Sequence, residues 1–221
     1  MPDHPKHNVF LTGSTGYMGS RLAARLLARG HTVRALTRAP SAKKLPPGCV
    51  PVIGDALTED YGAQVPPSDT FVHLVGVSHP SPAKAAEFRS IDLVALRAAV
   101  NVASASRIKH FVFVSVAHPA PAMKAYIAVR EECEQHIRES GLNATILRPW
   151  YVLGPGHRWP YVLLPMYWLM ERIPSKRESA LRLGLVTLEQ MLNTLVAAVE
   201  NPAEGIKVLS VTDIRQSQKR K

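Results

Sequence analysis

The sequence predicts an α/β fold, a doubly wound parallel sheet with helices on both faces. Short runs rich in Val, Ile and Phe recur along the chain, and longer helical patterns separate them. Strands that alternate with helices form parallel βαβ units with right-handed crossovers, whose strands are buried on both faces. A length of 221 residues, with 46% hydrophobic and 20% charged residues, is typical of a globular chain with one sizeable core. We therefore expect a single domain over residues 1–221.

Seven runs are predicted to be buried strands, because each is apolar and is bounded by Gly, Pro, Asp or Asn. They are NVFLTG (8–13), TVRALTR (32–38), CVPVIGDA (49–56), TFVHLVG (70–76), HFVFVSV (110–116), ATILRP (144–149) and KVLSVTD (207–213). Four amphipathic patterns between them predict helices, over residues 19–30, 85–106, 124–141 and 187–202. Gly30 and Gly141 stand where helix-ending glycines belong.

Residues 154–180 break the alternation, with GPGHRWP followed by a proline-interrupted apolar stretch. We expect an insertion over about 154–185 that covers a substrate pocket at the carboxyl ends of the strands, where ligands bind in such sheets. His157 and Arg158 would lie at the pocket mouth or form a plain turn. Large apolar side chains in this stretch would wall an apolar pocket or form an association surface. They are Trp159, Tyr161, Leu163, Leu164, Met166, Tyr167, Trp168 and Leu169.

The net charge and the cysteine content indicate which partners and which cellular compartment to expect. The net charge of +10 is scattered, and the one dense basic run is the tail RQSQKRK, so we expect a solvated tail and no nucleic-acid partner. Cys49 and Cys133 lie far apart without metal-like spacing, which favours a reducing compartment. The start of the chain has no signal-like apolar core, and no run reaches the roughly 20 apolar residues of a membrane span, so we expect a cytoplasmic protein.

The nine histidines include no HExxH pattern and no metal-like pair, and no metal site is expected. His73 lies within a predicted strand and is interpreted as a hydrogen-bonded core residue.

A glycine loop follows the first predicted strand and opens the first helix. Gly13, Gly16 and Gly19 stand in the spacing GxxGxxG. The first glycine allows a tight turn, the second lets backbone amides approach a pyrophosphate, and the third lets the helix pack on the strand. The positive end of the helix would then face the phosphates. The pattern alone also fits an ordinary strand-helix turn, but its βαβ context predicts a dinucleotide site.

The end of the second predicted strand favours NADP over NAD. A carboxylate here would bind the adenosine ribose of NAD, but RALTR offers Thr37 and then Arg38. Arg38 could pair with the 2′-phosphate of NADP or remain a solvated surface residue. Asp55, after the third strand, could accept a hydrogen bond from the adenine amino group or cap the next turn.

These motifs resemble the short-chain dehydrogenase/reductase superfamily, in an atypical branch related to NmrA-like proteins and nucleotide-sugar epimerases. The resemblance rests on TGSTGYMG, GDA, HLVG, FVFVSV, YIAVR and SGLNATILRP and runs from Asn8 to about Gly156, with a weaker echo to Asp213. It implies a Rossmann-like domain with a small C-terminal segment that shapes the substrate pocket. The cofactor-binding residues it implies are Gly13, Ser14, Thr15, Gly16, Tyr17, Met18 and Gly19 for the phosphates, Arg38 for the 2′-phosphate, Asp55 and Ala56 for adenine, Val75 and Gly76 for ribose, and Pro149 and Trp150 near the nicotinamide.

The resemblance also implies a catalytic tyrosine that exchanges a proton with the substrate oxygen, and a lysine four residues later that lowers the pKa of this tyrosine and binds the ribose. This sequence has Tyr126 but Arg130. Arginine keeps the positive charge, but its planar guanidinium cannot reproduce the bonds of a compact ammonium to the two ribose hydroxyls. Ser115 resembles the serine that polarises the substrate oxygen, although Val116 stands where many relatives carry a second serine. Ser115 could instead be a strand-end hydroxyl bonded to backbone, and Tyr126 a half-buried helix residue.

The sequence therefore predicts an NADP-dependent oxidoreductase acting on a carbonyl or alcohol of a small molecule, which is apolar if residues 159–169 wall the pocket. The alternative is a nucleotide-binding sensor or assembly factor without turnover, which the change to Arg130 favours and the retained Tyr126 does not. A nucleotide-sugar epimerase is disfavoured, because the C-terminal part is short for a sugar-nucleotide lobe.

Overall fold

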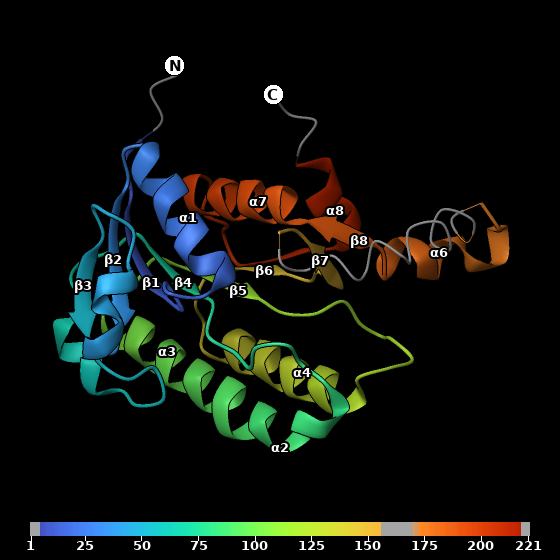
Figure 1. Cartoon of the computed structure of the whole chain (residues 1–221), viewed down its shortest axis with the longest axis horizontal. Coiled ribbons are helices and arrows are strands. Elements are labelled where there is room, and N and C mark those ends of the chain that lie inside the picture. The colour runs from blue at the N-terminus through green and yellow to red at the C-terminus, as the bar shows by residue number, and fades with distance from the viewer. Residues whose placement is uncertain (1–4, 156–169, 171, 218–221) are drawn as a thin grey trace.

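The computed structural model describes residues 5–155, 170 and 172–217 (Figure 1). Its centre is a seven-stranded parallel sheet with the order β3-β2-β1-β4-β5-β6-β9. The strands are β1 (Asn8–Thr12), β2 (Thr32–Thr37), β3 (Val50–Ile53), β4 (Thr70–His73), β5 (His110–Val114), β6 (Ala144–Leu147) and β9 (Ile206–Leu209). All seven predicted strands lie in this sheet, and the strand order reverses between β1 and β4.

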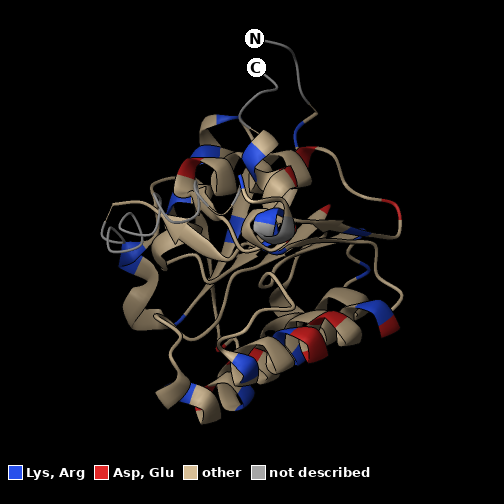
Figure 2. Ribbon diagram, turned by 90° about the vertical axis from the view of Figure 1, so that its right-hand side faces the viewer, with Lys and Arg blue, Asp and Glu red and all other residues tan. Residues whose placement is uncertain are grey.

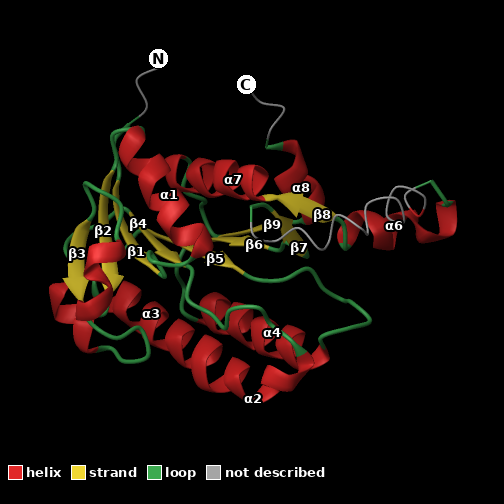
Figure 3. Cartoon of the chain, viewed as in Figure 1, coloured by secondary structure: helices red, strands yellow, loops and turns green. Residues whose placement is uncertain are grey.

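Helices cover both faces of the sheet, as Figure 3 shows. One layer holds α1 (Tyr17–Ala28), α7 (Leu188–Glu200) and α8 (Val211–Gln216). The other layer holds α3 (Val94–Ala105) and α4 (Lys124–Glu139), and α3 is preceded by α2 (Ala85–Glu87) and a π-helical segment, Phe88–Leu93. Gly30 and Gly141 follow α1 and α4 with φ of +86° and +74°. The doubly wound α/β fold is confirmed.

Each face of the sheet has its own apolar core, because successive side chains of a strand point to opposite faces. Val9 and Leu11 of β1 pack with Leu22 and Leu26 of α1 and with residues of α7. Phe10, between them in sequence, packs on the other face with a group of aromatic and aliphatic residues from α3 and α4. Strands buried on both faces explain why the runs in the sequence are continuously apolar.

Several short elements were not predicted. β7 (Tyr151–Leu153) and β8 (Leu185–Thr187) pair in parallel as a separate two-stranded sheet, and α6 is Pro174–Arg182. The predicted last strand also ends earlier than expected. Ser210 caps α8 through its side chain, which accepts from the backbone of Asp213, while the Asp213 carboxylate accepts from the Ser210 amide. This capping box begins a helix where a strand was expected to continue.

Of the predicted insertion over 154–185, residues 156–169 and 171 lie outside the described part of the chain. His157, Arg158 and the eight large apolar residues at 159–169 therefore remain sequence-based expectations. None of the helices in the described ranges is both long and apolar enough to span a membrane.

Basic and acidic residues are interspersed along the outer helices, as the blue and red segments of the ribbon in Figure 2 show. On the α3 and α4 side, for example, Arg89 and Arg97 both pair with Glu132.

Candidate functional site

The residues predicted to meet the cofactor lie at one edge of the sheet. Parallel strands end at the same edge, so the segments after β1, β2, β3, β4 and β6 are brought together there. The first of these segments, the glycine loop, leads directly into α1 (Figure 1). The topology thus gathers segments that are up to 137 residues apart, from Gly13 to Trp150, on one edge.

The glycine loop depends on two close backbone approaches. Gly13 has φ +75°, and a Cβ there would lie 2.6 Å from the carbonyl oxygen of Leu74, just after β4. A Cβ on Gly19, in the first turn of α1, would lie 2.1 Å from the Gly13 carbonyl oxygen. By contrast, a Cβ on Gly16 would meet the Gly13 oxygen at 3.2 Å and no other atom within 4 Å. Gly13 and Gly19 therefore fix the helix against the strands, whereas Gly16 is exposed and its backbone is accessible to a ligand.

The start of α1 presents backbone N–H groups that no side chain caps. Gly16 is its N-cap, and no side chain caps the first turn, which begins with Tyr17, Met18 and Gly19. Thr15 and Gly16 are exposed. Ser14 is buried, and its hydroxyl donates to the carbonyl oxygen of Leu36 at 3.2 Å, so this side chain ties the loop to β2. An exposed, uncapped helix start is suited to an anion such as a pyrophosphate.

Arg38 and Asp55 follow β2 and β3 at this edge. Arg38 is exposed, and its guanidinium makes no hydrogen bond or ion pair with a described residue, although its carbonyl oxygen accepts from the Thr37 hydroxyl at 3.3 Å. It begins a short helical segment, Ala39–Lys44, that adds Lys43 and Lys44 nearby in the chain. Asp55 is exposed, and its Oδ1 accepts from the Leu57 amide at 3.0 Å, so it caps the following turn. Ala56 beside it is half-buried.

The turns after β4 and β6 complete the edge. Val75 and Gly76 are half-buried. Pro149 is buried, and its carbonyl oxygen accepts from the Ala117 amide at 2.8 Å. Trp150 is half-buried, packs against the core on the α1 side and meets the Tyr151 ring edge-on at 5.5 Å between centroids.

Tyr126 and Arg130 lie one turn apart on α4, as their spacing predicts, and they touch. The Arg130 guanidinium carbon lies 5.0 Å from the centroid of the half-buried Tyr126 ring and 5.3 Å from that of Phe113. Arg130 is buried; it forms an ion pair with Asp92 and donates to the Val114 carbonyl oxygen at 3.2 Å. Burial lowers the pKa of Arg130, but Tyr126 and Asp92 outweigh this effect and raise the pKa above its ordinary value.

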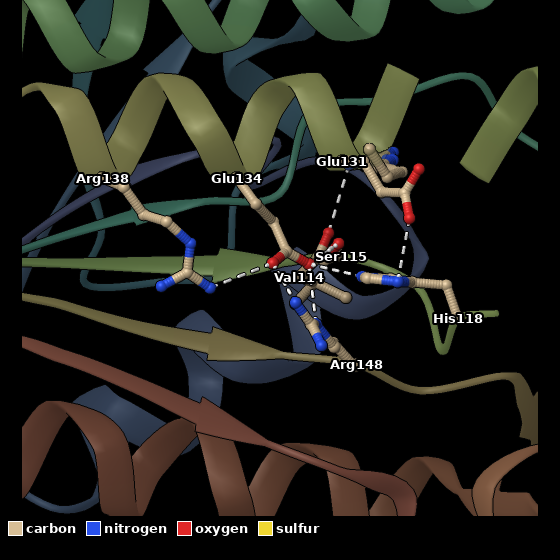
Figure 4. A network of polar contacts seen from close by, with 8 residues as sticks. Val114, Ser115, His118, Glu131, Glu134, Arg138 and Arg148 are labelled. Carbon is tan, nitrogen blue, oxygen red and sulfur yellow. Dashed lines mark hydrogen bonds and ion pairs between the residues drawn. The ribbon is translucent and has the colours of Figure 1, made fainter. Parts of the chain in front are cut away.

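Ser115 belongs to a second polar cluster, centred on Glu134 (Figure 4). Its buried hydroxyl donates to Glu134 Oε1 at 2.7 Å. Arg148 binds the same carboxylate through Nε at 2.9 Å and Nη2 at 2.5 Å, and His118 Nε2 lies 3.6 Å from Oε1. Burial raises the pKa of Glu134, but hydrogen bonds from Arg148 and Ser115 outweigh it, so the pKa lies below its ordinary value. The Ser115 hydroxyl is thus engaged with a carboxylate.

Asp92 and Glu134 were not singled out in the sequence, although both organise the site. Glu134 follows Tyr126 by eight residues, so two helical turns place it on the same face. Asp92 is a lone carboxylate within the apolar pattern IDLVALRAAV. A charged residue on the buried face of a predicted helix is the signal that identifies each of them, because such a residue requires a partner.

His73 is a core residue, as predicted, but only one ring nitrogen is bonded within the described part of the chain. Nδ1 lies 3.0 Å from the Thr12 hydroxyl, and Nε2 is buried without a partner there. Burial, followed by the charge of Arg130, lowers the pKa of His73 to about 3, so its ring is neutral at physiological pH. Among the described residues, no group of three or more His, Cys, Asp or Glu side chains could hold a metal ion.

The described residues fit a dinucleotide. The exposed backbone at Gly16 and the uncapped start of α1 suit the pyrophosphate. The exposed Arg38 guanidinium at the end of β2 suits an additional phosphate. Neither feature is needed by the fold itself, because no described side chain uses these donors.

Comparison with known proteins identifies relatives along most of the chain. Ceramide reductase of Caulobacter vibrioides (strain NA1000 / CB15N) is 25% identical over 215 residues, covering 94% of this chain and 65% of the relative. A 4-hydroxy-2-methyl-3-oxo-4-farnesyl-3,4-dihydroquinoline-1-oxide ketoreductase of Stigmatella aurantiaca is 27% identical over 173 residues, covering 66% of this chain and 50% of the relative. The chain thus spans about half to two thirds of the length of these relatives.

Solved structures share the fold. The Bordetella bronchiseptica enzyme WbmH in complex with NAD+ superposes with a TM-score of 0.69 at 22% identity, covering 93% of this chain and 76% of the other. UDP-glucose 4-epimerase of Thermotoga maritima, with UDP-glucose, gives a TM-score of 0.66 at 16% identity, covering 96% of this chain and 82% of the other.

The family model described as NAD(P)H-binding matches residues 13–161, which include the glycine loop, the turn after β4 and the Tyr126 helix. The chain belongs to this NAD(P)H-binding family, and its fold is of the Rossmann type.

Proposed function

We propose that the chain is an NADP-dependent oxidoreductase that interconverts a carbonyl and an alcohol on a small apolar molecule. One observation carries the proposal. One edge of the sheet holds the glycine loop with the uncapped start of α1, the exposed Arg38 side chain and the turn after β4. The helix that bears Tyr126 lies beside this edge. If the nucleotide served only to stabilise the fold, the exposed Arg38 guanidinium at this edge would have no role.

Arg38 supports NADP as the preferred cofactor. It is exposed just after the end of β2, and its guanidinium has no partner among the described residues. A guanidinium can bind a phosphate through two parallel hydrogen bonds. Lys43 and Lys44 add positive charge in the segment that follows. The 2′-phosphate, which NAD lacks, would meet these groups.

Other residues would hold the rest of the cofactor. The backbone amides of residues 14–19 would bind the pyrophosphate, with Ser14 fixing the loop on β2. Asp55 and Ala56 would bind adenine, Val75 and Gly76 would line the ribose, and Pro149 and Trp150 would lie near the nicotinamide. The bound cofactor supplies or accepts the hydride.

Tyr126 would exchange the proton with the substrate oxygen. In the reducing direction its hydroxyl donates a proton to the carbonyl oxygen as the carbonyl carbon is reduced, and the phenolate regains a proton from solvent. Arg130 lies against the Tyr126 ring, and its charge would stabilise the negative charge that develops on the tyrosine oxygen in the transition state of proton transfer. Asp92 balances part of this charge, so Arg130 is a weaker replacement for a free lysine. Ser115 could polarise the substrate oxygen only after turning away from Glu134.

An apolar substrate is supported by the sequence and by the names of relatives. Eight large apolar residues crowd into residues 159–169, which the sequence places just after the nicotinamide end of the site. Among the relatives, one is named for ceramide and one for a farnesylated quinoline oxide. A third, from Mycolicibacterium neoaurum, is a 3-beta-hydroxysteroid dehydrogenase that is 37% identical over 70 residues, covering 31% of this chain and 19% of the relative.

The test combines binding with turnover. The purified protein is titrated with NADPH and NADH, and then incubated with NADPH and a panel of long-chain ketones, aldehydes, steroid ketones and quinones while absorbance at 340 nm is followed. We expect tighter binding of NADPH and turnover with at least one apolar carbonyl. Binding without turnover of any panel member would favour the nucleotide-binding sensor instead.

A further inference from the structure

The Asp92 carboxylate is fully buried beneath the turn that follows β4. Its side chain has no exposed surface. Oδ1 pairs with Arg130, and Oδ2 accepts from the Val77 amide at 3.0 Å. Both carboxylate oxygens are therefore engaged, one with helix α4 and one with the backbone of the turn. Burial raises the pKa of Asp92 above its ordinary value, against the opposing effects of Arg130 and the Val77 amide.

Gly76 lies directly against this ion pair. A Cβ at position 76 would lie 2.6 Å from Arg130 Nη2 and 2.9 Å from Asp92 Oδ1. Any larger residue would separate the turn from the pair. The absence of a side chain at Gly76 is therefore explained by the contact between the turn and the two buried charges.

Arg130 extends the contact to the next strand. Its Nη1 donates to the Val114 carbonyl oxygen at the end of β5, at 3.2 Å. The pair thus connects the ends of two adjacent strands, β4 and β5, and both ends lie at the proposed cofactor edge. A buried ion pair contributes little net stability, because desolvation of the charges offsets their attraction, so a role in geometry explains it better than a role in stability.

The backbone of the preceding helix is shaped to place the carboxylate there. Asp92 lies in the π-helical segment Phe88–Leu93, between α2 and α3. Widened helical turns of this kind are rare and often occur at functional sites. Phe88 and Leu93 of the same segment pack into the α3 and α4 core, so the segment is held firmly.

We propose that Asp92 is a positioning residue for the cofactor: it holds the Gly76–Val77 turn and Arg130 in the arrangement that forms the ribose-binding wall. The statement that this arrangement binds the cofactor ribose rests on the proposed function. The statement that Asp92 holds the turn does not. Asp92 touches neither cofactor nor substrate in this account. It acts through the Val77 amide and the Arg130 guanidinium.

The test uses two variants that separate the contacts. Asp92→Asn removes the charge opposite Arg130 but keeps an oxygen that can accept from Val77. Asp92→Ala removes both contacts. Glu200→Gln is the matched control, because Glu200 is also a carboxylate in an ion pair, with Arg29 at 2.6 Å, and only 8% of its side chain is exposed. It lies at the end of α7 that is far from the glycine loop. Circular dichroism and thermal unfolding identify any variant that fails to fold.

Two readouts are compared, the hydrogen exchange rate of the Val77 amide without cofactor and the Kd values for NADPH and NADH. In Asp92→Ala we expect Val77 exchange to rise at least tenfold and both Kd values to rise about tenfold, which is the loss of one hydrogen bond to a charged group. The ratio of the two Kd values should stay unchanged, because both cofactors carry the same ribose. Asp92→Asn should raise the Kd values while changing Val77 exchange less.

Unchanged Kd values in both Asp92 variants would overturn the proposal, as would equal effects of Glu200→Gln on Val77 exchange and on Kd. If the parent protein bound neither nucleotide, the proposed function and the ribose wall would fail together. Val77 exchange would then still decide whether Asp92 holds the turn.

Discussion

At the residue scale, Arg38 is the side chain that we expect to decide between NADP and NAD. It is exposed just after the end of β2, and its guanidinium has no partner among the described residues. Arg38→Ala should therefore leave the fold unchanged and weaken NADPH binding by one to two decades, the value of a charge-assisted contact of about 1.5–3 kcal/mol. NADH binding should change little. Isothermal titration of both cofactors measures the two affinities.

Arg34→Ala is the control for a general loss of positive charge. Arg34 lies within β2, four residues before Arg38, and is therefore away from the carboxyl end of the strand. We expect this variant to keep the preference for NADPH. Equal affinities for NADPH and NADH in the parent protein would remove the basis for assigning NADP.

The candidate site was predictable at the residue scale wherever a backbone pattern defines it. The spacing of Gly13 and Gly19 and the position of Arg38 follow from their places next to strands. Side-chain partners were not predictable in this way. Nothing near Ser115 in sequence indicates that its hydroxyl donates to Glu134, nineteen residues away on α4. Likewise, the partner of Arg130 is Asp92, on a different helical segment, and only folding brings the two together.

At the element scale, the glycine loop and α1 form one unit that depends on Gly19. A Cβ here would lie 2.1 Å from the Gly13 carbonyl oxygen, so the start of α1 would have to move away from β1. Gly19→Ala should weaken NADPH and NADH binding together by at least tenfold and lower the free energy of unfolding by about 1–3 kcal/mol, as overpacking does. Titration and urea unfolding measure the two effects.

Gly62→Ala is the control that tests whether a methyl group added at any tight glycine would weaken cofactor binding. Its Cβ would meet Val102 Cγ2 at 3.3 Å, in a region away from the loop, and its backbone φ is not positive. We expect cofactor binding to remain unchanged in this variant. If Gly19→Ala bound both cofactors normally, the loop would not be the phosphate site.

The elements themselves were largely predictable, because seven buried strands and four amphipathic helices leave clear periodic patterns. The exceptions have physical reasons. β7 and β8 are three residues long, too short for a period to be visible. α8 begins at the capping box of Ser210 and Asp213, a local signal within the run that was interpreted as a strand. The π-helical turn at Phe88–Leu93 has no counterpart in an apolar pattern.

At the scale of the whole molecule, stability should depend on pH through buried neutral histidines. His110 is fully buried, with its ring nitrogens near the hydroxyls of Thr70 and Thr145, and burial lowers its pKa to about 4. The unfolded chain takes up a proton near pH 6.5. Between pH 6.5 and about 4 the unfolded state therefore binds more protons, and stability falls as pH falls.

The expected loss from His110 alone is about 3 kcal/mol by pH 4. Urea unfolding at pH 7, 5.5 and 4.5 measures the slope, and His110→Gln should flatten it even if it lowers stability at pH 7. His73, whose pKa is lowered to about 3, adds a slope in the same direction that this variant leaves intact. Parallel slopes for parent and variant would show that His110 does not titrate on unfolding.

The most direct test of the central claim compares Tyr126→Phe with the parent protein in two measurements on the same samples. Turnover of an apolar carbonyl is followed by NADPH oxidation at 340 nm, and NADPH affinity is measured by titration. Because Tyr126→Phe removes the proton donor and leaves the ring against Phe88 and Arg130, it should cost about two to four decades in kcat with little change in Kd. Equal turnover in the two proteins, or NADPH binding without turnover in the parent, would contradict the assignment of an oxidoreductase that uses Tyr126.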